Sequence, residues 1–312
     1  MLDRFSLKLR QSMELKDKIR FTERRISEWV EHFGINGCYV SFSGGKDSTV
    51  LLHIVRSLYP DIEAVFVDTG LEYPEIRTFV KTFDNVTILR PELSFDKVIQ
   101  EYGYPIISKE VSETIEGARR CLQLDNGKYK YRLDKLNGEK KNKDGTVSHH
   151  NCTKWKFLLE APFKISNKCC NIMKKKPTHK FTKDTGKVPI IATMACESKL
   201  RESQYLRQGC NGFNNKLPTS TPMAFWTEQD VLKYIYENKI PIASVYGNVI
   251  KTDKYSTTGC QRTGCMFCGY GCHLEKQPNR FQRLKQTHPK QYDYIIDKLG
   301  FGKVLDFIKV EY

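Results

Sequence analysis

The sequence predicts an α/β fold in which a parallel sheet carries helices on both faces. Two β-rich runs, CYVSF (38–42) and EAVFVDT (63–69), enclose the amphipathic helical pattern STVLLHIVRSLYP. Strands joined by a helix at this separation run parallel, with a right-handed crossover. The chain has 312 residues, of which 39% are hydrophobic, and this is enough to bury a large core.

Further elements follow in order along the chain. Apolar residues recur at helical spacing from Leu15 to Phe33, and Gly34 supplies a stop for this predicted helix. The runs VTILR (86–90) and VPIIAT (188–193) predict two more strands. Thr227 is expected to cap a helix that begins TEQDVLKYIYE. A cysteine- and glycine-rich segment and a helical tail occupy residues 251–312.

Positive charge is concentrated in one stretch. The chain has 51 Lys and Arg against 36 Asp and Glu, a net charge of +15, and residues 128–187 hold 17 basic and 5 acidic side chains. Few large aliphatic residues occur between Gly127 and Gly145, which predicts a surface loop or hairpin inside a basic insertion at about 127–187. Such a stretch indicates either a polyanionic partner, such as a nucleic acid, or a solvated lysine-rich insertion.

The composition also predicts the cellular setting. No run approaches the roughly 20 apolar residues that a membrane span needs, and the first residues lack a signal-peptide core. We therefore expect a cytoplasmic protein without a membrane partner. In that compartment the 11 cysteines are expected to be thiols, catalytic groups or metal ligands rather than disulfides.

The segment SFSGGKDS lies directly between the first predicted strand and the next helix. Consecutive glycines allow a tight turn with inward-facing amides, and the helix N-terminus adds partial positive charge, so the segment predicts a phosphate site. Lys46 would be an exposed, mobile cation, and the pattern differs from the GxxxxGK[ST] of ordinary P-loop proteins. The expected phosphate-binding residues are Ser41, Ser43, Gly44, Gly45, Lys46, Asp47 and Ser48.

Residues 43–48 match the SGGxDS signature of the PP-loop superfamily, which the chain therefore resembles. The resemblance implies a Rossmann-like, adenine nucleotide alpha hydrolase-like sheet in a nucleotide-binding domain at 35–250, after an N-terminal helical segment at 1–34. It also implies that the loop grips the pyrophosphate of ATP, with Lys46, Asp47 and Ser48 at the catalytic centre. The segment VDTGLEYPE (67–75) is similar to the one that lines the adenosine pocket, with Asp68 and Thr69 as the matching positions.

Over roughly residues 35–290 the chain resembles the phosphoadenosine phosphosulfate (PAPS) and adenosine phosphosulfate (APS) reductase family. The segment ESKLRESQYLR is similar to the arginine-bearing anion-binding stretch of that family, which implies this role for Glu197, Arg201 and Arg207. Arginine can grip a phosphate or sulfate in bidentate fashion. An ordinary charged helix with i,i+4 pairs is the alternative interpretation.

Four cysteines form an adjacent pair and a C-x-x-C, at Cys169, Cys170, Cys265 and Cys268. Four thiolates suit a [4Fe-4S] cluster or a structural zinc, and the adjacent pair favours the cluster because each thiolate can take a separate iron. Cys260 or Cys272 could replace one of the four. The arrangement resembles the iron-sulfur reductases of the family. Lysines at 174–176 follow the adjacent pair, where they would stabilise the negative charge of a cluster.

The intact SGGKDS loop, the expected cluster and the basic stretch resemble the ATP-dependent sulfur-transfer branch, whose members thiolate tRNA or the DNA backbone. This leads us to expect an enzyme that uses ATP and Mg²⁺ and forms AMP and pyrophosphate, with a sulfur or electron donor protein as partner. The alternative is a PAPS or APS reductase that releases sulfite. A further alternative is a nucleic-acid-binding accessory without turnover. The reductases carry a degraded loop and a cysteine in an ECGLH-like motif, whereas no cysteine follows Cys272 here.

Overall fold

The structure is a computed structural model that describes residues 2–124 and 127–312. The chain divides into two compact units with interleaved segments. The first, here called the sheet unit, comprises Met1–Asp68, Glu72–Arg90 and Pro177–Thr263; the second, the cysteine unit, comprises Thr69–Leu71, Pro91–Lys176 and Gly264–Tyr312. The division at 1–34, 35–250 and 251–312 stays a prediction about domain boundaries. Among the described residues, no helix combines the length and apolar character that crossing a membrane requires.

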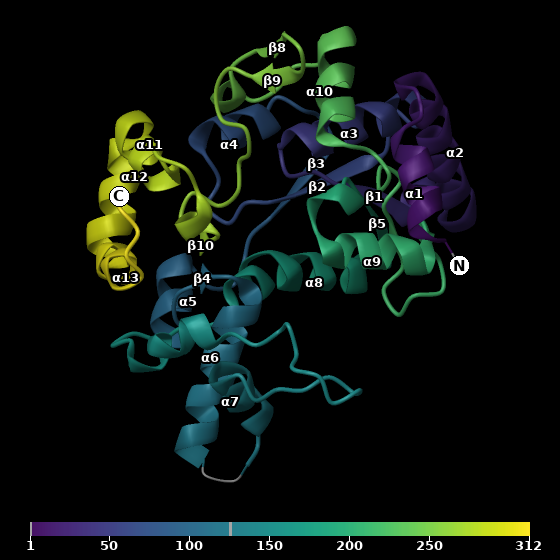
Figure 1. Ribbon diagram of the computed structural model, residues 1–312. Coiled ribbons are helices and arrows are strands. Elements are labelled where there is room, and N and C mark those ends of the chain that lie inside the picture. The colour runs from purple at the N-terminus through teal and green to yellow at the C-terminus, as the bar shows by residue number, and fades with distance from the viewer. Residues whose placement is uncertain (1, 125–126) are drawn as a thin grey trace. The chain divides into compact units, whose positions relative to one another are not determined.

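The sheet unit is built on six strands in the order β3-β2-β1-β5-β7-β6 (Figure 1). All neighbouring strands pair in parallel except β6, which is antiparallel to β7. Their bounds are β1 Cys38–Ser41, β2 Glu63–Val67, β3 Val86–Leu89, β5 Val188–Ile191, β6 Asn211–Gly212 and β7 Thr219–Ser220. The structure therefore confirms the predicted parallel sheet. Its longer strands are rich in β-branched and aromatic residues, which favour strands.

Helices cover both faces of this sheet. On one face α3 packs against α2, α10 and β1. On the other, Tyr39 of β1 meets Phe181 of α8 with ring centroids 5.2 Å apart. Successive strand residues point to opposite faces, so the buried Val40 lies on the α3 side. The helices are α1 Arg4–Gln11, α2 Leu15–Phe33, α3 Lys46–Leu58, α4 Pro74–Val80, α8 Lys176–Thr185, α9 Lys199–Gln208 and α10 Glu228–Glu237.

Two predicted helix boundaries in the sheet unit are confirmed. Gly34, with φ +75°, ends α2 by donating its N–H to the Val30 carbonyl. Thr227 caps α10, since its hydroxyl accepts the Asp230 N–H and the Asp230 carboxylate accepts the Thr227 N–H in return. The unit is completed by the hairpin of β8 (Val249–Lys251) with β9 (Tyr255–Thr257) and by the short 3₁₀ helices η1 (Ile35–Gly37), η4 (Ala195–Glu197) and η5 (Ser244–Tyr246).

The strand order creates a switch point at the carboxyl end of β1. The chain leaves β1 through α3 to β2 on one side, and β5 pairs with the other side of β1. In open parallel sheets, ligands bind outside the carboxyl ends of the strands where such connections diverge. The SGGKDS segment follows β1, and η4 follows β5. The fold therefore brings these two segments to the same edge of the sheet.

The cysteine unit is mainly helical, with one short parallel pair between β4 (Ile106–Ile107) and β10 (Gly269–Tyr270). Phe281 and Phe301 are fully buried in it, with ring centroids 5.5 Å apart. Its helices are α5 Phe95–Tyr102, α6 Lys109–Leu124, α7 Lys130–Asn137, α11 Arg280–Thr287, α12 Pro289–Asp293 and α13 Phe301–Phe307. Its 3₁₀ helices are η2 Thr153–Glu160 and η6 Cys272–Leu274, and its π-helices are η3 Asn171–Lys175 and η7 Tyr294–Lys298.

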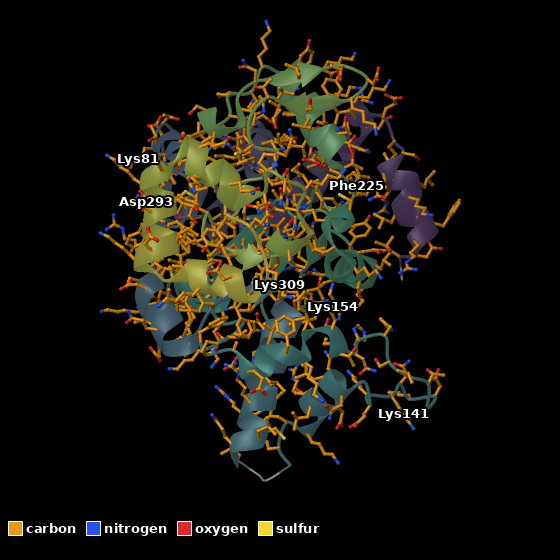
Figure 2. The ribbon with its side chains drawn as sticks, turned by 60° about the vertical axis from the view of Figure 1, so that its left-hand side comes forward. Lys81, Lys141, Lys154, Phe225, Asp293 and Lys309 are labelled. Carbon is orange, nitrogen blue, oxygen red and sulfur yellow. The ribbon has the colours of Figure 1, made fainter. Side chains whose placement is uncertain are left out.

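The prediction of a loop or hairpin from Gly127 to Gly145 is wrong in part, because the segment contains α7. This helix packs on α6, where Leu136 is fully buried and the Lys135 ammonium pairs with Glu110 at 2.5 Å. The residues of α7 that are buried are Lys135 and Leu136, so the helix leaves little hydrophobic periodicity in the sequence. The following residues do form a hairpin, closed by a bridge between Lys141 and Val147, and Lys141 points outward from it (Figure 2).

Candidate functional site

The SGGKDS segment turns directly from β1 into α3. Ser41 ends the strand, and the turn depends on Gly44, whose φ is +70°. The Ser48 hydroxyl donates to the Gly45 carbonyl at 2.9 Å and accepts the Ser43 N–H at 3.2 Å. The Gly45 N–H points to the Ser43 hydroxyl at 3.4 Å. Two amides of the turn therefore face hydroxyl oxygens within the loop, in a geometry that an oxyanion can also satisfy.

Replacing Gly44 with alanine is expected to destabilise the sheet unit. A Cβ at this position would lie 2.8 Å from Cγ2 of both Ile76 and Val80, in addition to the strain of a left-handed backbone. The two effects together should lower the free energy of unfolding by about 2–4 kcal/mol, measured by urea denaturation. Gly186→Ala is the matched control, because Gly186 has φ +71° and open space around its Cβ position. Equal losses in the two variants would contradict the steric argument.

Lys46 is not the exposed cation that the sequence predicts. It is only 5% exposed, and its ammonium donates to the Gln261 carbonyl at 2.7 Å and pairs with the Glu228 carboxylate at 3.2 Å. The same ammonium lies 5.5 Å from the ring centroid of Tyr246. These three partners are far away in sequence, on α10, η5 and the segment after β9, so local pattern gave no sign of them.

Tyr246 is a buried neighbour of the loop. Burial raises the pKa of Tyr246 to about 12, while hydrogen bonds from the Thr263 side chain and the Lys46 backbone N–H lower it. Its hydroxyl bonds to that of Thr263. The amide and the ammonium of Lys46 therefore both have oxygen partners from the chain itself. A phosphate at this position would take the place of the Tyr246 hydroxyl and the Gln261 carbonyl.

The structure brings the predicted Glu197 and Arg201 to the loop. Burial raises the pKa of the Asp47 carboxyl, and the nearby Glu228 also raises it. The positive charges of Lys46, Arg262 and Arg201 lower this pKa. These groups therefore share one electrostatic environment. Glu197 forms ion pairs with Arg201 and, at 3.1 Å, with Arg262, and it accepts the Met194 N–H at 2.9 Å.

Two charged members of this group, Glu228 and Arg262, were missed from the sequence. Arg262 stands three residues before the first cysteine of the C-x-x-C and looked like part of the cysteine segment. Together Lys46, Arg201 and Arg262 face Asp47, Glu197 and Glu228, so positive and negative charges balance. Anionic ligand groups can be accepted here by exchange of ion-pair partners, since all three cations already have carboxylate neighbours.

Other predicted positions lie outside this group. Arg207 is exposed further along α9, where its Nε donates to the Ser203 carbonyl at 3.4 Å. Asp68 follows β2 at the same sheet edge and pairs with Arg77 at 2.9 Å. The Thr69 hydroxyl accepts the Leu71 N–H at 3.2 Å. Their roles in binding adenosine or an anion stay predictions.

Within the cysteine unit, the four predicted ligand cysteines lie near one another. Burial raises the pKa of Cys169 strongly, the thiols of its three partners raise it further, and Lys174 lowers it; the partners are Cys170, Cys265 and Cys268. Burial also raises the pKa of Cys268. In residues 2–124 and 127–312, no three His, Cys, Asp or Glu side chains are arranged to hold one metal ion.

The two alternative cysteines have different surroundings. Cys272 is almost fully buried in the cysteine unit, where its thiol donates to the Gly269 carbonyl at 3.1 Å. Burial raises the pKa of Cys272 to about 11. Cys260 belongs to the sheet unit, where its N–H donates to the Val245 carbonyl at 2.9 Å and its thiol raises the pKa of Tyr246.

Comparison with known protein families gives a match over most of the chain. The profile of the phosphoadenosine phosphosulfate reductase domain matches residues 37–106 and 108–269. The chain belongs to this family. The matched residues include the SGGKDS loop, Glu197, Arg201 and all four predicted cluster cysteines, so the family resemblance stated from the sequence is confirmed.

Three proteins similar to this chain illustrate the range of relatives. An uncharacterized protein of Methanocaldococcus jannaschii is 25% identical over 91% of this chain, which spans about half (54%) of that relative's length. The adenosine 5'-phosphosulfate reductase of Geobacillus kaustophilus is 25% identical, covering 70% of this chain and 68% of its own. A crystal structure of phosphoadenylyl-sulfate reductase from Candida auris covers 82% of this chain and 98% of its own at 14% identity, with a TM-score of 0.40.

Proposed function

We propose that the chain is an enzyme of sulfur metabolism that binds an adenine nucleotide at the SGGKDS loop and transfers sulfur in an ATP-dependent reaction. The observation that carries the proposal is the junction at the β1 and β5 ends. There an intact loop, the Lys46 ammonium and the Arg201–Glu197–Arg262 group lie in one compact unit. Loop amides and cations at a switch point suit a triphosphate.

In this reaction an oxygen of the acceptor attacks the α-phosphorus of ATP, and the bond from that phosphorus to pyrophosphate breaks. The sulfur of a hydrosulfide-type donor then displaces AMP from the adenylated acceptor. The loop amides and Lys46 would stabilise charge on the leaving pyrophosphate, and Arg201 and Arg262 would orient the remaining phosphate. Asp47 supplies a carboxylate with which Mg²⁺ could associate, and Mg²⁺ would neutralise phosphate charge when bound.

We also propose that the cysteine group holds a [4Fe-4S] cluster through Cys169, Cys170, Cys265 and Cys268. Around one zinc ion the four sulfurs would have to lie about 3.8 Å apart, whereas a cluster attaches each thiolate to a different iron and needs wider spacing. The adjacent pair Cys169 and Cys170 therefore fits the cluster better than zinc, because each of its thiolates can take a separate iron. Lys174, which lowers the pKa of Cys169, would offset the negative charge.

A PAPS or APS reductase is the second candidate, because curated relatives bear that name. In that reaction a thiolate attacks the sulfate sulfur, and the bond from that sulfur to the nucleotide breaks, so that AMP or its 3'-phosphorylated form leaves. An external dithiol then reduces the resulting thiosulfonate, which releases sulfite and regenerates the thiol. The two candidates give different products. Anaerobically purified protein should release pyrophosphate from ATP and Mg²⁺ under the first, and sulfite from APS or PAPS with thioredoxin under the second. Sulfite without pyrophosphate would overturn the first candidate.

The acceptor class is proposed from charge. The exposed lysines of the cysteine unit include Lys141 and Lys154 (Figure 2). Exposed aromatic rings of the same unit include Tyr131 and Phe157. Lysines with interleaved aromatics favour a nucleic-acid acceptor, and a cytoplasmic location would agree with this. Binding of tRNA or DNA that does not weaken as salt rises would argue against this acceptor. Nucleic-acid binding without any turnover would instead favour the accessory.

Glu228→Gln is expected to tighten nucleotide binding. Removing the carboxylate charge frees the Lys46 ammonium for phosphate, and the pair involves a half-exposed glutamate, so the gain should be about 0.5–1 kcal/mol, or two- to fivefold in Kd. Isothermal titration with ATP and with PAPS measures it. Glu237→Gln, at the other end of α10, is the control and should leave Kd unchanged. A higher Kd in Glu228→Gln than in wild type would mean that Glu228 assists nucleotide binding directly.

A further inference from the structure

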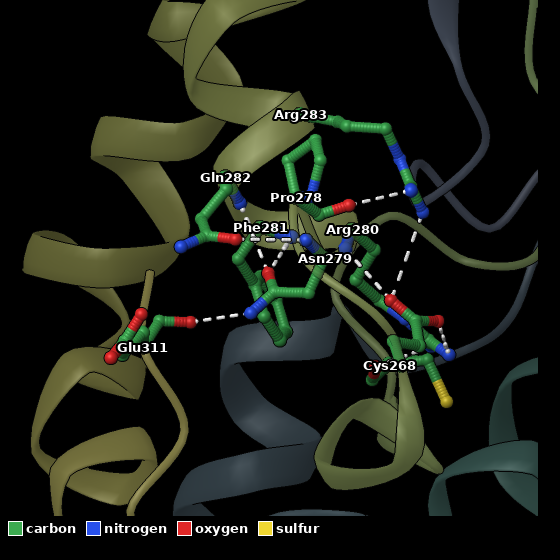
Figure 3. Close-up of polar contacts among 9 residues, drawn as sticks. Cys268, Pro278, Asn279, Arg280, Phe281, Gln282, Arg283 and Glu311 are labelled. Carbon is green, nitrogen blue, oxygen red and sulfur yellow. Dashed lines mark hydrogen bonds and ion pairs between the residues drawn. The ribbon is translucent and has the colours of Figure 1, made fainter.

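A partly buried arginine is tied to both the C-x-x-C turn and a carboxylate. Arg280 begins α11, and its Nη1 donates to the Cys268 carbonyl at 2.9 Å (Figure 3). Its Nε and Nη2 donate to Oε1 of Glu275 at 2.8 Å and 2.6 Å, and its backbone N–H donates to Oε2 at 2.7 Å. The guanidinium is therefore fixed by three separate hydrogen bonds.

The start of α11 is itself rigidly held. Asn279 is 3% exposed and caps the helix, since its Oδ1 accepts the N–H groups of Phe281 and Gln282 at 2.9 Å and 3.1 Å. Its Nδ2 donates to the Glu311 carbonyl at 2.6 Å, which ties the cap to the C-terminal segment (Figure 3). The adjacent Phe281 is fully buried. The backbone of Arg280 therefore has a fixed origin from which its side chain reaches the cysteine turn.

We propose that Arg280 is a positioning residue for the cysteine group, fixing the C-x-x-C turn through the Cys268 carbonyl and holding a permanent cation beside the thiolates. The inference rests on the proposed cluster. A cluster bound by four thiolates carries negative charge, and groups just outside the ligands tune both its retention and its potential. Arginine suits this place because it stays charged and its planar fork can bond two partners at once.

Hydrogen bonds to Glu275 hold Arg280 in the orientation that this role needs. Glu275 keeps the guanidinium from turning away, because it bonds the side chain and backbone of the same arginine. Glu275 is thus the second member of the device, and its loss should weaken the effect of Arg280 without removing the charge.

The same helix offers a matched control. Arg283 also approaches Glu275, at 3.8 Å, but its Nη1 donates to the Pro278 carbonyl at 2.7 Å and its side chain is 53% exposed. Figure 3 labels both Arg280 and Arg283 on this helix, together with Pro278. Arg283→Gln therefore removes one positive charge from the same helix while leaving the bond to Cys268 in place.

The test compares Arg280→Gln, Arg280→Lys and Arg283→Gln as full-length proteins loaded anaerobically with iron and sulfide. We measure bound iron and sulfide, the rate of iron release to a chelator, and the midpoint potential from the visible spectrum during dithionite titration. Arg280→Gln should release iron about 10- to 100-fold faster than wild type and have a lower potential. Arg280→Lys should release iron faster but keep a potential closer to wild type, because charge is retained without the fork.

Thermal unfolding of the apo-proteins checks that each variant folds. If Arg280→Gln does not fold, Glu275→Gln replaces it in the test, and we expect its iron-release rate to lie between those of wild type and Arg280→Gln. The proposed role of Arg280 would be wrong if the protein holds a cluster but Arg280→Gln and Glu275→Gln have the same iron-release rate and potential as Arg283→Gln. That result would leave the proposed cluster itself intact. A wild-type chain that takes up no iron or sulfide would overturn the proposed cluster and with it this inference.

Discussion

Replacing Lys46 with methionine is expected to lower nucleotide-dependent turnover about 100-fold or more, because it removes a preorganised charge from the phosphate site. Methionine keeps the apolar stem, so the loss can be assigned to the ammonium. Pyrophosphate release from ATP is the measurement, with nucleotide Kd recorded in parallel. If the ammonium acts mainly in the transition state, kcat should fall more than Kd rises.

The burial of Lys46 changes what this variant should do to stability. An exposed lysine would leave stability unaffected, but the structure places the ammonium against the Gln261 carbonyl and Glu228. Leaving the Gln261 carbonyl without its donor should cost about 1–3 kcal/mol in the free energy of unfolding. Lys81→Met, at an exposed position after α4, is the control and should change neither property. Wild-type turnover in Lys46→Met would remove the loop from the mechanism.

Cys169→Ser is expected to leave less than about a tenth of the wild-type iron after anaerobic loading, since even residues outside the ligand shell commonly matter 10- to 100-fold. Cys169 is buried with its three partner thiols around it, so the serine hydroxyl would face the same enclosed site with a poorer ligand. Iron and acid-labile sulfide per chain, together with the visible spectrum, provide the measurement. The same loss is expected for Cys268→Ser.

Cys121→Ser is the matched control, because Cys121 is buried on α6 of the same unit without belonging to the thiol group. It should retain wild-type iron. Cys260→Ser and Cys272→Ser decide the ligand set, and both should keep the cluster under the proposal. If Cys169→Ser keeps its full iron content and Cys272→Ser loses iron, Cys272 would be the cluster ligand in place of Cys169.

The sequence was informative wherever local chemistry dictates structure. The β-branched runs at 38–42 and 188–193 became strands because such side chains fit a pleated, buried surface, and Thr227 capped its helix through its own hydroxyl. The helix α7 was missed because the residues that it buries are Lys135 and Leu136, which leaves little hydrophobic periodicity. Its many lysines instead suggested a solvated loop.

The loop of the candidate site could be predicted from the sequence, but the residues that surround the loop could not. The adjacent Gly44 and Gly45 predict the turn. Arg201 was predicted from the family resemblance. By contrast, Glu228 and Gln261 reach Lys46 from 182 and 215 residues away along the chain, and no local pattern encodes such distances. The proximity of the four thiols likewise depends on how residues 169–170 and 265–268 are brought together by the fold.

The interleaving of the two units has a consequence for how this protein is made. The backbone passes from one unit to the other at 68/69, 71/72, 90/91, 176/177 and 263/264. Strand β1 therefore leaves the ribosome long before its partner β5, and neither half of the molecule can be expressed as a continuous fragment. Distant pairings of this kind slow folding. Deletion analysis would damage both units at once, so point substitutions are the suitable way to dissect them.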